Sequence, residues 1–172
     1  MSYILHLTSY IKQSETMSEI GDKIQSKCMA FADRVIRLND YLLEQAASRK
    51  SEGRSQKEDT RRGKHLTSSV LPLTSRVPVH LQAIATLCNQ LLRAGTSIGA
   101  NNAEATNAIS KQDFRSKSFI ALKEARESLY WIDLLHRNGY LDDKQFESIY
   151  SDCEELVKIL VNRCKKLNEE EA

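Results

Sequence analysis

The stretch QLLRAGTSIGANNAEA, residues 90–105, places two glycines and a run of small residues inside a segment with the apolar period of a helix. Apolar or small residues recur there at steps of three and four, which is the spacing of one helix face. A glycine within a helix costs about 0.5–1 kcal/mol relative to alanine, so two of them require a compensating contact. Gly95 and Gly99 lie one turn apart and form a ridge against which a neighbouring backbone can pack closely.

A matching stripe of small residues occurs on the next predicted helix. Its members follow one another at steps of three and four: Ser118, Ala121, Ala125 and Ser128. We therefore expect the second and third helices to pack closely, with Gly95 and Gly99 facing Ala121 and Ala125. Asn102 falls in the apolar seam of the second helix, where we expect it to hydrogen-bond across the seam and to fix the register of the helices.

Start and stop signals divide the chain into four helices. A capping box at Thr16–Glu19 predicts a first helix over roughly residues 18–46, and Pro78 suits the first turn of the second. Ser110 caps the third helix, which should end at Asn138–Gly139, and Asp142 caps the fourth. Because the links after the second and third helices are short, neighbouring helices should be antiparallel. The sequence predicts an all-α protein, an up-down-up-down four-helix bundle.

Two segments are expected to lie outside this bundle. Residues 1–16 are interpreted as a poorly ordered N-terminal appendage, and residues 17–172 as one bundle domain. Within that domain, residues about 48–76 are rich in Ser, Arg, Lys, Gly and Thr, and predict a flexible insert between the first two helices. Residues 49–64 hold seven Lys or Arg against three Asp or Glu, so the insert is locally basic in a chain of net charge +2.

Composition and motifs favour no catalytic function. The four cysteines lie in apolar helical patterns without C-x-x-C spacing, which indicates reduced thiols and a cytoplasmic protein. No apolar run is long enough to cross a membrane. Asp133 and His136 are a single imperfect match to the carboxylate and histidine helices of di-iron bundles, so we expect no metal and no cofactor. Gly95–Gly99 lacks the Gly-Lys-Ser/Thr of a phosphate-binding loop, and no hydrolase motif is present.

One outward face of the third helix combines cations with aromatic rings. Its members recur at steps of four, four, three and four: Arg115, Phe119, Lys123, Arg126 and Tyr130. Such a mixture suits nucleic acid, through phosphate contacts and base stacking. It suits a subunit interface equally well, because Arg and Tyr are enriched there. The sequence leaves these two alternatives open.

Several stretches together resemble a known family. They are FADRVIRLNDYLL, QLLRAGTSIGANNAEA, SKQDFRSKSFIALKEARESLYWIDLL and GYLDDKQFESIYSDCEELVKIL, which cover roughly residues 22–46 and 79–168. In this order they closely resemble the 23S rRNA intervening sequence protein family of bacterial four-helix bundle proteins. The resemblance implies a homopentamer without catalytic activity, and hence a self-assembling, RNA-associated scaffold.

A related branch suggests a second function. The accessory variability protein of diversity-generating retroelements is similar to this family and binds a reverse transcriptase and its template RNA. The alternative implied by this branch is a protein-interaction module whose partner is a reverse transcriptase. Both readings include copies of the chain itself as partners, and neither involves a membrane.

Overall fold

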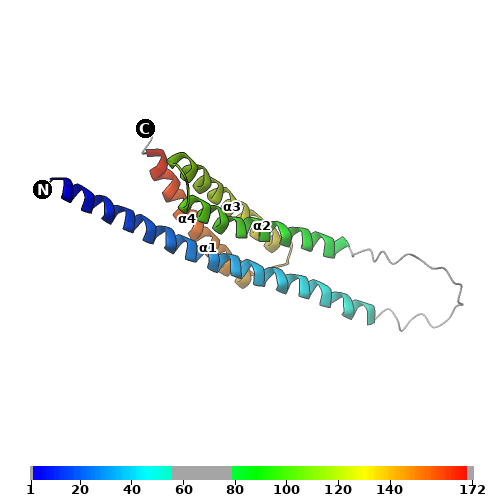
Figure 1. The fold of residues 1–172 in the computed structure, drawn as a ribbon. Helices are drawn as coiled ribbons and strands as arrows, with labels where there is room; N and C mark the ends of the chain where they lie inside the picture. The colour runs from blue at the N-terminus through cyan, green and yellow to red at the C-terminus, as the bar shows by residue number, and fades with distance from the viewer. Residues whose placement is uncertain (1, 56–78, 170–172) are drawn as a thin grey trace, which may run out of the picture.

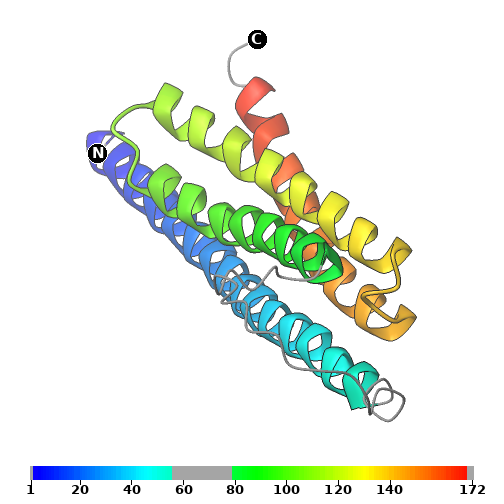
Figure 2. The same ribbon diagram turned by 90° about the vertical axis from the view of Figure 1, so that its right-hand side faces the viewer.

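A computed structural model of the chain describes the backbone of residues 2–55 and 79–169 and the side chains of residues 20–48 and 81–169. These residues form α1 (Ser2–Ser55), α2 (Val79–Thr106), α3 (Lys111–Arg137) and α4 (Asp143–Glu169), and they contain no strand. Each helix packs against its neighbour in the chain, and α4 also contacts α1. The predicted all-α four-helix bundle is confirmed, and Figures 1 and 2 show the helices running alongside one another.

The first helix is much longer than its pattern predicted. It runs from Ser2 to Ser55 instead of from about 18 to 46, so the capping box at Thr16–Glu19 does not begin it. No glycine or proline interrupts residues 2–20, and nothing in that stretch therefore forces a helix end. Figure 1 shows the N-terminal part of α1 extending beyond the other three helices. The division into an appendage and a domain stays a prediction, but residue 16 marks no helix boundary.

The expected insert is shorter at its start than predicted. Residues 48–55 continue α1, whose last turns contain Gly53. The remainder of the predicted insert lies in residues 56–78, outside the described residues.

The helix ends around the two short links are those that the sequence predicted. The Ser110 side chain accepts a hydrogen bond from the backbone N–H of Asp113 at 3.1 Å, and so caps α3. At the other end of α3, Asn138 is the C-cap and Gly139 follows with φ 71°, a conformation that favours glycine. Asp142 and Gln145 form a reciprocal capping box at the start of α4, with N···O distances of 2.8 and 3.1 Å. With links of only residues 107–110 and 138–142 between them, α2, α3 and α4 run antiparallel (Figure 2).

The core lies along the predicted seams. Its largest fully buried apolar side chains come from all four helices: Phe31, Val35, Ile98, Ile132, Leu135, Leu156 and Leu160. The small stripe of α3 is buried throughout, because Ser118, Ala121, Ala125 and Ser128 are each fully buried. One neighbour of this stripe is α4, since the Cys153 thiol lies 3.3 Å from the backbone oxygen of Ala125.

The two glycines of α2 face α1, which corrects the prediction that they face α3. A Cβ added at Gly95 would lie 3.1 Å from a Val35 methyl carbon and 3.4 Å from the Phe31 ring. A Cβ added at Gly99 would lie 3.4 Å from the Cβ of Cys28. The pairing of α2 with α3 is still extensive. The period of a sequence identifies a buried face but not the helix that covers it, which is why Ala121 and Ala125 were matched to the wrong partner.

Contact between α1 and α4 is limited and includes two ion pairs. The Arg34 guanidinium is paired with Asp152 and donates to the Ser148 hydroxyl at 2.8 Å. A second ion pair joins Lys27 of α1 to Glu155 of α4, with the Lys27 Nζ 2.9 Å from a Glu155 carboxylate oxygen. Such exposed ion pairs contribute about 0–1 kcal/mol each. Apolar packing therefore holds α1 mainly to α2, and α4 mainly to α3.

The glycine contacts predict opposite effects of two substitutions on the free energy of unfolding. Gly21→Ala should raise it by about 0.5–1 kcal/mol, because its new Cβ would meet Thr106 only at an ordinary 3.7 Å. Gly95→Leu should lower it by about 1–3 kcal/mol, because the added side chain would overlap Val35 and Phe31. Urea denaturation followed by circular dichroism measures both. Equal stability of Gly95→Leu and the wild type would contradict the close approach of α1.

Candidate nucleic-acid interface

The five predicted residues lie along one side of α3, but their surroundings differ. Lys123 and Arg126 are exposed, and Tyr130 is 58% exposed. Arg115 is half-buried, and its guanidinium donates to the Asn168 side-chain oxygen of α4 at 2.9 Å. The stripe therefore borders α4 at its N-terminal end and opens to solvent further along α3.

The two aromatic rings of this face are not equally available. Phe119 is partly buried against the core, and the Arg115 guanidinium carbon lies 5.6 Å from its ring centre. Arg115 thus covers part of the Phe119 ring on which a nucleic-acid base would stack. Tyr130 packs edge-on against Trp131 with ring centres 4.8 Å apart, and its remaining surface is open. Tyr130 is thus the better placed of the two for stacking.

Positive charge gathers where α3 and α4 meet. Cys164 of α4 is buried, and this burial raises the pKa of its thiol. The positive charges of Arg163, Arg126 and Arg115 lower the pKa of this thiol. All three guanidinium groups therefore lie close enough to Cys164 to affect it electrostatically. Arginines are effectively always protonated, and this region is therefore positively charged at any physiological pH.

Asn102 joins three helices by direct hydrogen bonds, as its seam position predicted. Its side chain is fully buried; the amide nitrogen donates to the Gln25 oxygen of α1 at 2.6 Å. The amide oxygen accepts from Arg163 of α4 at 2.8 Å. Sequence reasoning did not identify Gln25 or Arg163 as partners. The available signal was that Arg163 is the one charged residue in the apolar seam of α4.

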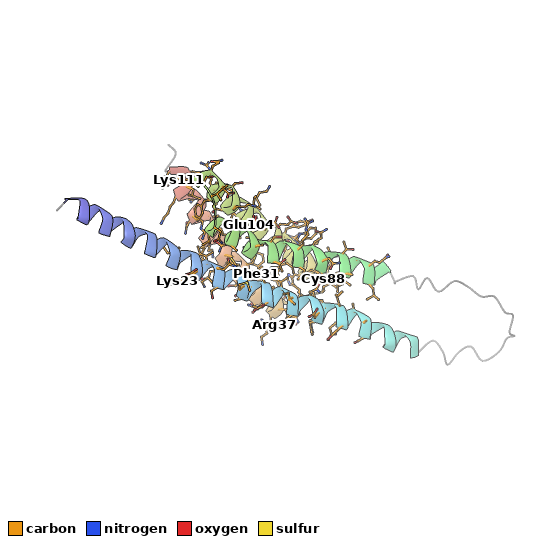
Figure 3. All side chains as sticks on the ribbon, in the orientation of Figure 1. Lys23, Phe31, Arg37, Cys88, Glu104 and Lys111 are labelled. Carbon is orange, nitrogen blue, oxygen red and sulfur yellow. The ribbon has the colours of Figure 1, made fainter. Side chains whose placement is uncertain are left out.

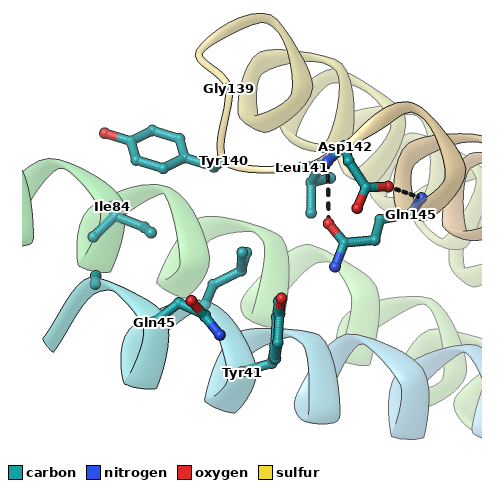
Figure 4. A pocket seen from close by; sticks show the side chains of 10 residues that line it. Tyr41, Gln45, Ile84, Gly139, Tyr140, Leu141, Asp142 and Gln145 are labelled. Atoms are coloured by element: carbon teal, nitrogen blue, oxygen red, sulfur yellow. Dashed lines mark hydrogen bonds between the residues drawn. The ribbon is translucent and has the colours of Figure 1, made fainter. Parts of the chain in front are cut away.

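The opposite end of the bundle contains a recess of about 250 Å³. Figure 4 shows it beneath the α3–α4 turn, with Tyr140 and Leu141 above, and with Tyr41 and Gln45 of α1 below. Two of the polar residues that line it, Asp142 and Gln145, already hydrogen-bond to each other in the capping box of α4.

The acidic and histidine side chains of α3 serve local contacts. His136 lies 2.9 Å from Asp143 and stacks on Phe146 with ring centres 4.1 Å apart. Within the described parts of the chain, no group of three or more His, Cys, Asp or Glu residues is arranged to hold a metal ion. In the same parts, no helix is long and apolar enough to span a membrane.

Comparison with known proteins identifies the family. The sequence pattern of the 23S rRNA-intervening sequence proteins matches residues 58–162, which is more than half of the chain. The chain belongs to the 23S rRNA-intervening sequence protein family. The matched range covers α2, α3 and most of α4. No curated protein has a significant match to the chain.

A crystal structure of a similar protein supports the fold of this family member. It is a protein of unknown function from the S23 ribosomal protein family of Bacteroides thetaiotaomicron. The two chains are 32% identical, and the alignment covers 85% of this chain and 98% of the other. The TM-score of 0.59 indicates the same overall fold.

The Asn102 contacts predict that removing its side-chain amide lowers the free energy of unfolding much more than removing that of Asn101. Asn102→Ala should lower the free energy of unfolding by about 1–3 kcal/mol, because it leaves Gln25 and Arg163 without their partner. Asn101→Ala is the matched control, since Asn101 bonds only to the Ser97 carbonyl of its own helix at 2.9 Å. Both are measured by urea denaturation, and equal losses would show that the bonds between helices contribute nothing specific.

Burial of the cysteines predicts slow alkylation of the folded protein. Desolvation raises the pKa of the Cys28 and Cys88 thiols from 9.0 to about 11, and that of Cys153 to about 12. A rise of two pKa units lowers the reactive thiolate fraction about a hundredfold at pH 8. Iodoacetamide at pH 8 should therefore modify these thiols in urea but not in buffer, as read by mass spectrometry. Rapid modification of Cys153 in buffer would contradict its burial.

Proposed function

We propose that the protein is a non-enzymatic, self-assembling cytoplasmic scaffold that binds RNA through one face of α3. The binding face comprises Arg115, Phe119, Lys123, Arg126 and Tyr130. The observation that carries the proposal is the gathering of positive charge beside an open aromatic ring. Arg115 and Arg126 both act on Cys164, whereas Tyr130 is 58% exposed on the same side of α3.

The proposed roles follow from the surroundings of each side chain. Arg115, Lys123 and Arg126 contact phosphates, and Tyr130 stacks on a base. Phe119 holds Arg115 in place and becomes a stacking partner only when RNA displaces that guanidinium. Phosphate contacts are independent of base sequence and weaken as salt concentration rises. We therefore propose a face that recognises RNA mainly by charge.

Membership of the family supports an association with RNA. The family is named after an intervening sequence of 23S rRNA. The alternative is an accessory module that uses the same face to bind a reverse transcriptase. In that case, substitutions in the face would abolish binding of the reverse transcriptase but not of RNA.

Exposed apolar residues on α1 support self-assembly. Met29 and Ile36 lie seven residues apart on one flank of α1 and are 55% and 43% exposed. Large exposed apolar patches are characteristic of surfaces that bind other proteins. We propose that copies of the chain associate through this flank, as a homopentamer, and that the α3 face stays free for RNA.

Replacing the three cations of the face should abolish RNA binding without changing assembly. The test variant is Arg115→Glu, Lys123→Glu and Arg126→Glu, and binding to a fluorescent single-stranded RNA is measured by anisotropy across a salt series. Each lost phosphate contact should reduce the slope of log K against log salt by about 0.7, or about two in all. Light scattering on the same samples reports the oligomeric state.

A second triple variant controls for net charge. Lys23→Glu and Arg37→Glu on α1, with Lys144→Glu on α4, change the charge by the same amount at exposed positions. Figure 3 shows Lys23 and Arg37 on α1, away from α3. This control should retain most of the affinity. RNA binding unchanged in the α3 variant would reject the proposed face, and its dissociation to monomers would assign that face to assembly.

A further inference from the structure

The seam that α1 buries in the bundle continues along the N-terminal part of the helix. Within the bundle it consists of two rows at seven-residue spacing: Ile24, Phe31 and Leu38, and beside them Cys28, Val35 and Leu42. Toward the N-terminus the same spacing reaches only uncharged residues: Met17, Tyr10 and Tyr3 in the first row, and Gly21, Ser14 and Leu7 in the second. Residues seven apart share one helix face, so this face keeps the composition of a helix–helix contact as far as Tyr3.

The bundle itself covers only part of this seam. Gly21 lies at the end of α2, since a Cβ added there would be 3.7 Å from the hydroxyl oxygen of Thr106, the last residue of that helix. Residues 2–20, named here the α1 overhang, lie beyond this level and correspond to roughly 28 Å of helix. Figure 1 shows the overhang extending past the other three helices. Helices in water owe most of their stability to the packing of an apolar face, so a helix of this length requires a partner.

The charged residues of the overhang avoid the seam. They are Lys12, Glu15 and Glu19, and a helical period places all three away from the two rows. The positions that directly flank the rows hold three isoleucines besides His6 and small or neutral polar residues: Ile4, Ile11 and Ile20. A seam without charge, widened by apolar neighbours, is typical of a helix that packs against one other helix.

We propose that the α1 overhang pairs with the α1 overhang of a second copy of the chain, as an antiparallel two-stranded coiled coil. In a twofold pair, residue i of one copy meets residue j of the other, and j meets i. With the twofold axis at residue 12, every seam residue meets a seam residue of the other row. Leu7 then packs beside Met17 of the second copy.

The same register pairs large residues with small ones. Tyr10 of one copy meets Ser14 of the other, and Tyr3 meets Gly21. In a parallel pair each residue would meet its own counterpart, so tyrosine would face tyrosine and Gly21 would face Gly21, which packs less evenly. The overhang is thus complementary to itself in one direction, and this complementarity favours a second copy over a different protein as its partner.

Two exposed isoleucines lie at the end of the bundle from which the overhang extends. Ile20 is 53% exposed, and Ile109, in the link that follows α2, is 95% exposed. Because Tyr3 of the second copy meets Gly21, the N-terminal turns of that copy would lie at this end of the bundle. The proposed pair therefore supplies apolar cover where the described side chains are most exposed.

This contact is separate from the surfaces assigned to RNA binding and self-assembly. The RNA-binding face belongs to α3, and the flank with Met29 and Ile36 lies on a different side of α1 from the seam. Pairing of overhangs joins two copies, whether or not copies also associate through the flank. The assignments therefore have separate tests, and either can fail alone.

Sedimentation equilibrium of the full chain tests the pairing. The starting variant carries Met29→Glu and Ile36→Glu to disable the flank, and it should sediment as a dimer. Adding Leu7→Asp and Tyr10→Asp should halve its mass, because the pair would bury unpaired carboxylates in the seam. Adding Thr8→Asp and Ser9→Asp instead changes the charge equally in the same turn but outside the seam, and this control should stay dimeric. A monomeric starting variant, or equal dissociation of the two added pairs, would overturn the proposal.

Spin labels test the direction of the pairing. The four native cysteines are buried, so a label can be directed to Lys12→Cys or, in a second sample, to Glu19→Cys. An antiparallel pair about residue 12 keeps the two labels at residue 12 level with each other. It separates those at residue 19 by roughly 21 Å along the helix axis. Electron-electron resonance should therefore measure a clearly shorter distance at residue 12. Equal distances at both positions would indicate a parallel pair and contradict the proposed register.

Discussion

The approach of α2 to α1 at Gly95 and Gly99 determines how the bundle closes. Phe31 and Val35 occupy the space that a side chain at Gly95 would need, and Cys28 packs against Gly99. These α1 residues are themselves almost fully buried, so the glycines bring the apolar seam of α1 into the core. Without this contact α1 would depend on its exposed ion pairs with α4, which are individually weak.

The sequence predicts features whose cause is local. Ser110, Gly139 and Asp142 mark helix ends correctly because capping depends on residues within one turn. The start of α1 was predicted wrongly because nothing between residues 2 and 20 breaks a helix, and a capping box does not prevent one from continuing. The partner of Gly95 was also wrong, since α2 contacts both α1 and α3 and its period does not distinguish between them.

The candidate RNA-binding face was predictable as a stripe but not as a set of contacts. A helical period places Arg115 and Phe119 on one side, yet it does not reveal that the guanidinium covers the ring. Likewise, Asn102 could be assigned to the seam, whereas its bonds to Gln25 and Arg163 depend on how α1 and α4 are placed against α2. Such contacts between distant residues require the tertiary structure.

The connections between consecutive helices differ in length. Residues 107–110 and 138–142 join α2, α3 and α4, so these three helices can assemble through short-range contacts. Along the chain, α1 ends at Ser55 and α2 begins at Val79, so docking α1 requires closing a longer stretch of sequence, which costs more conformational entropy.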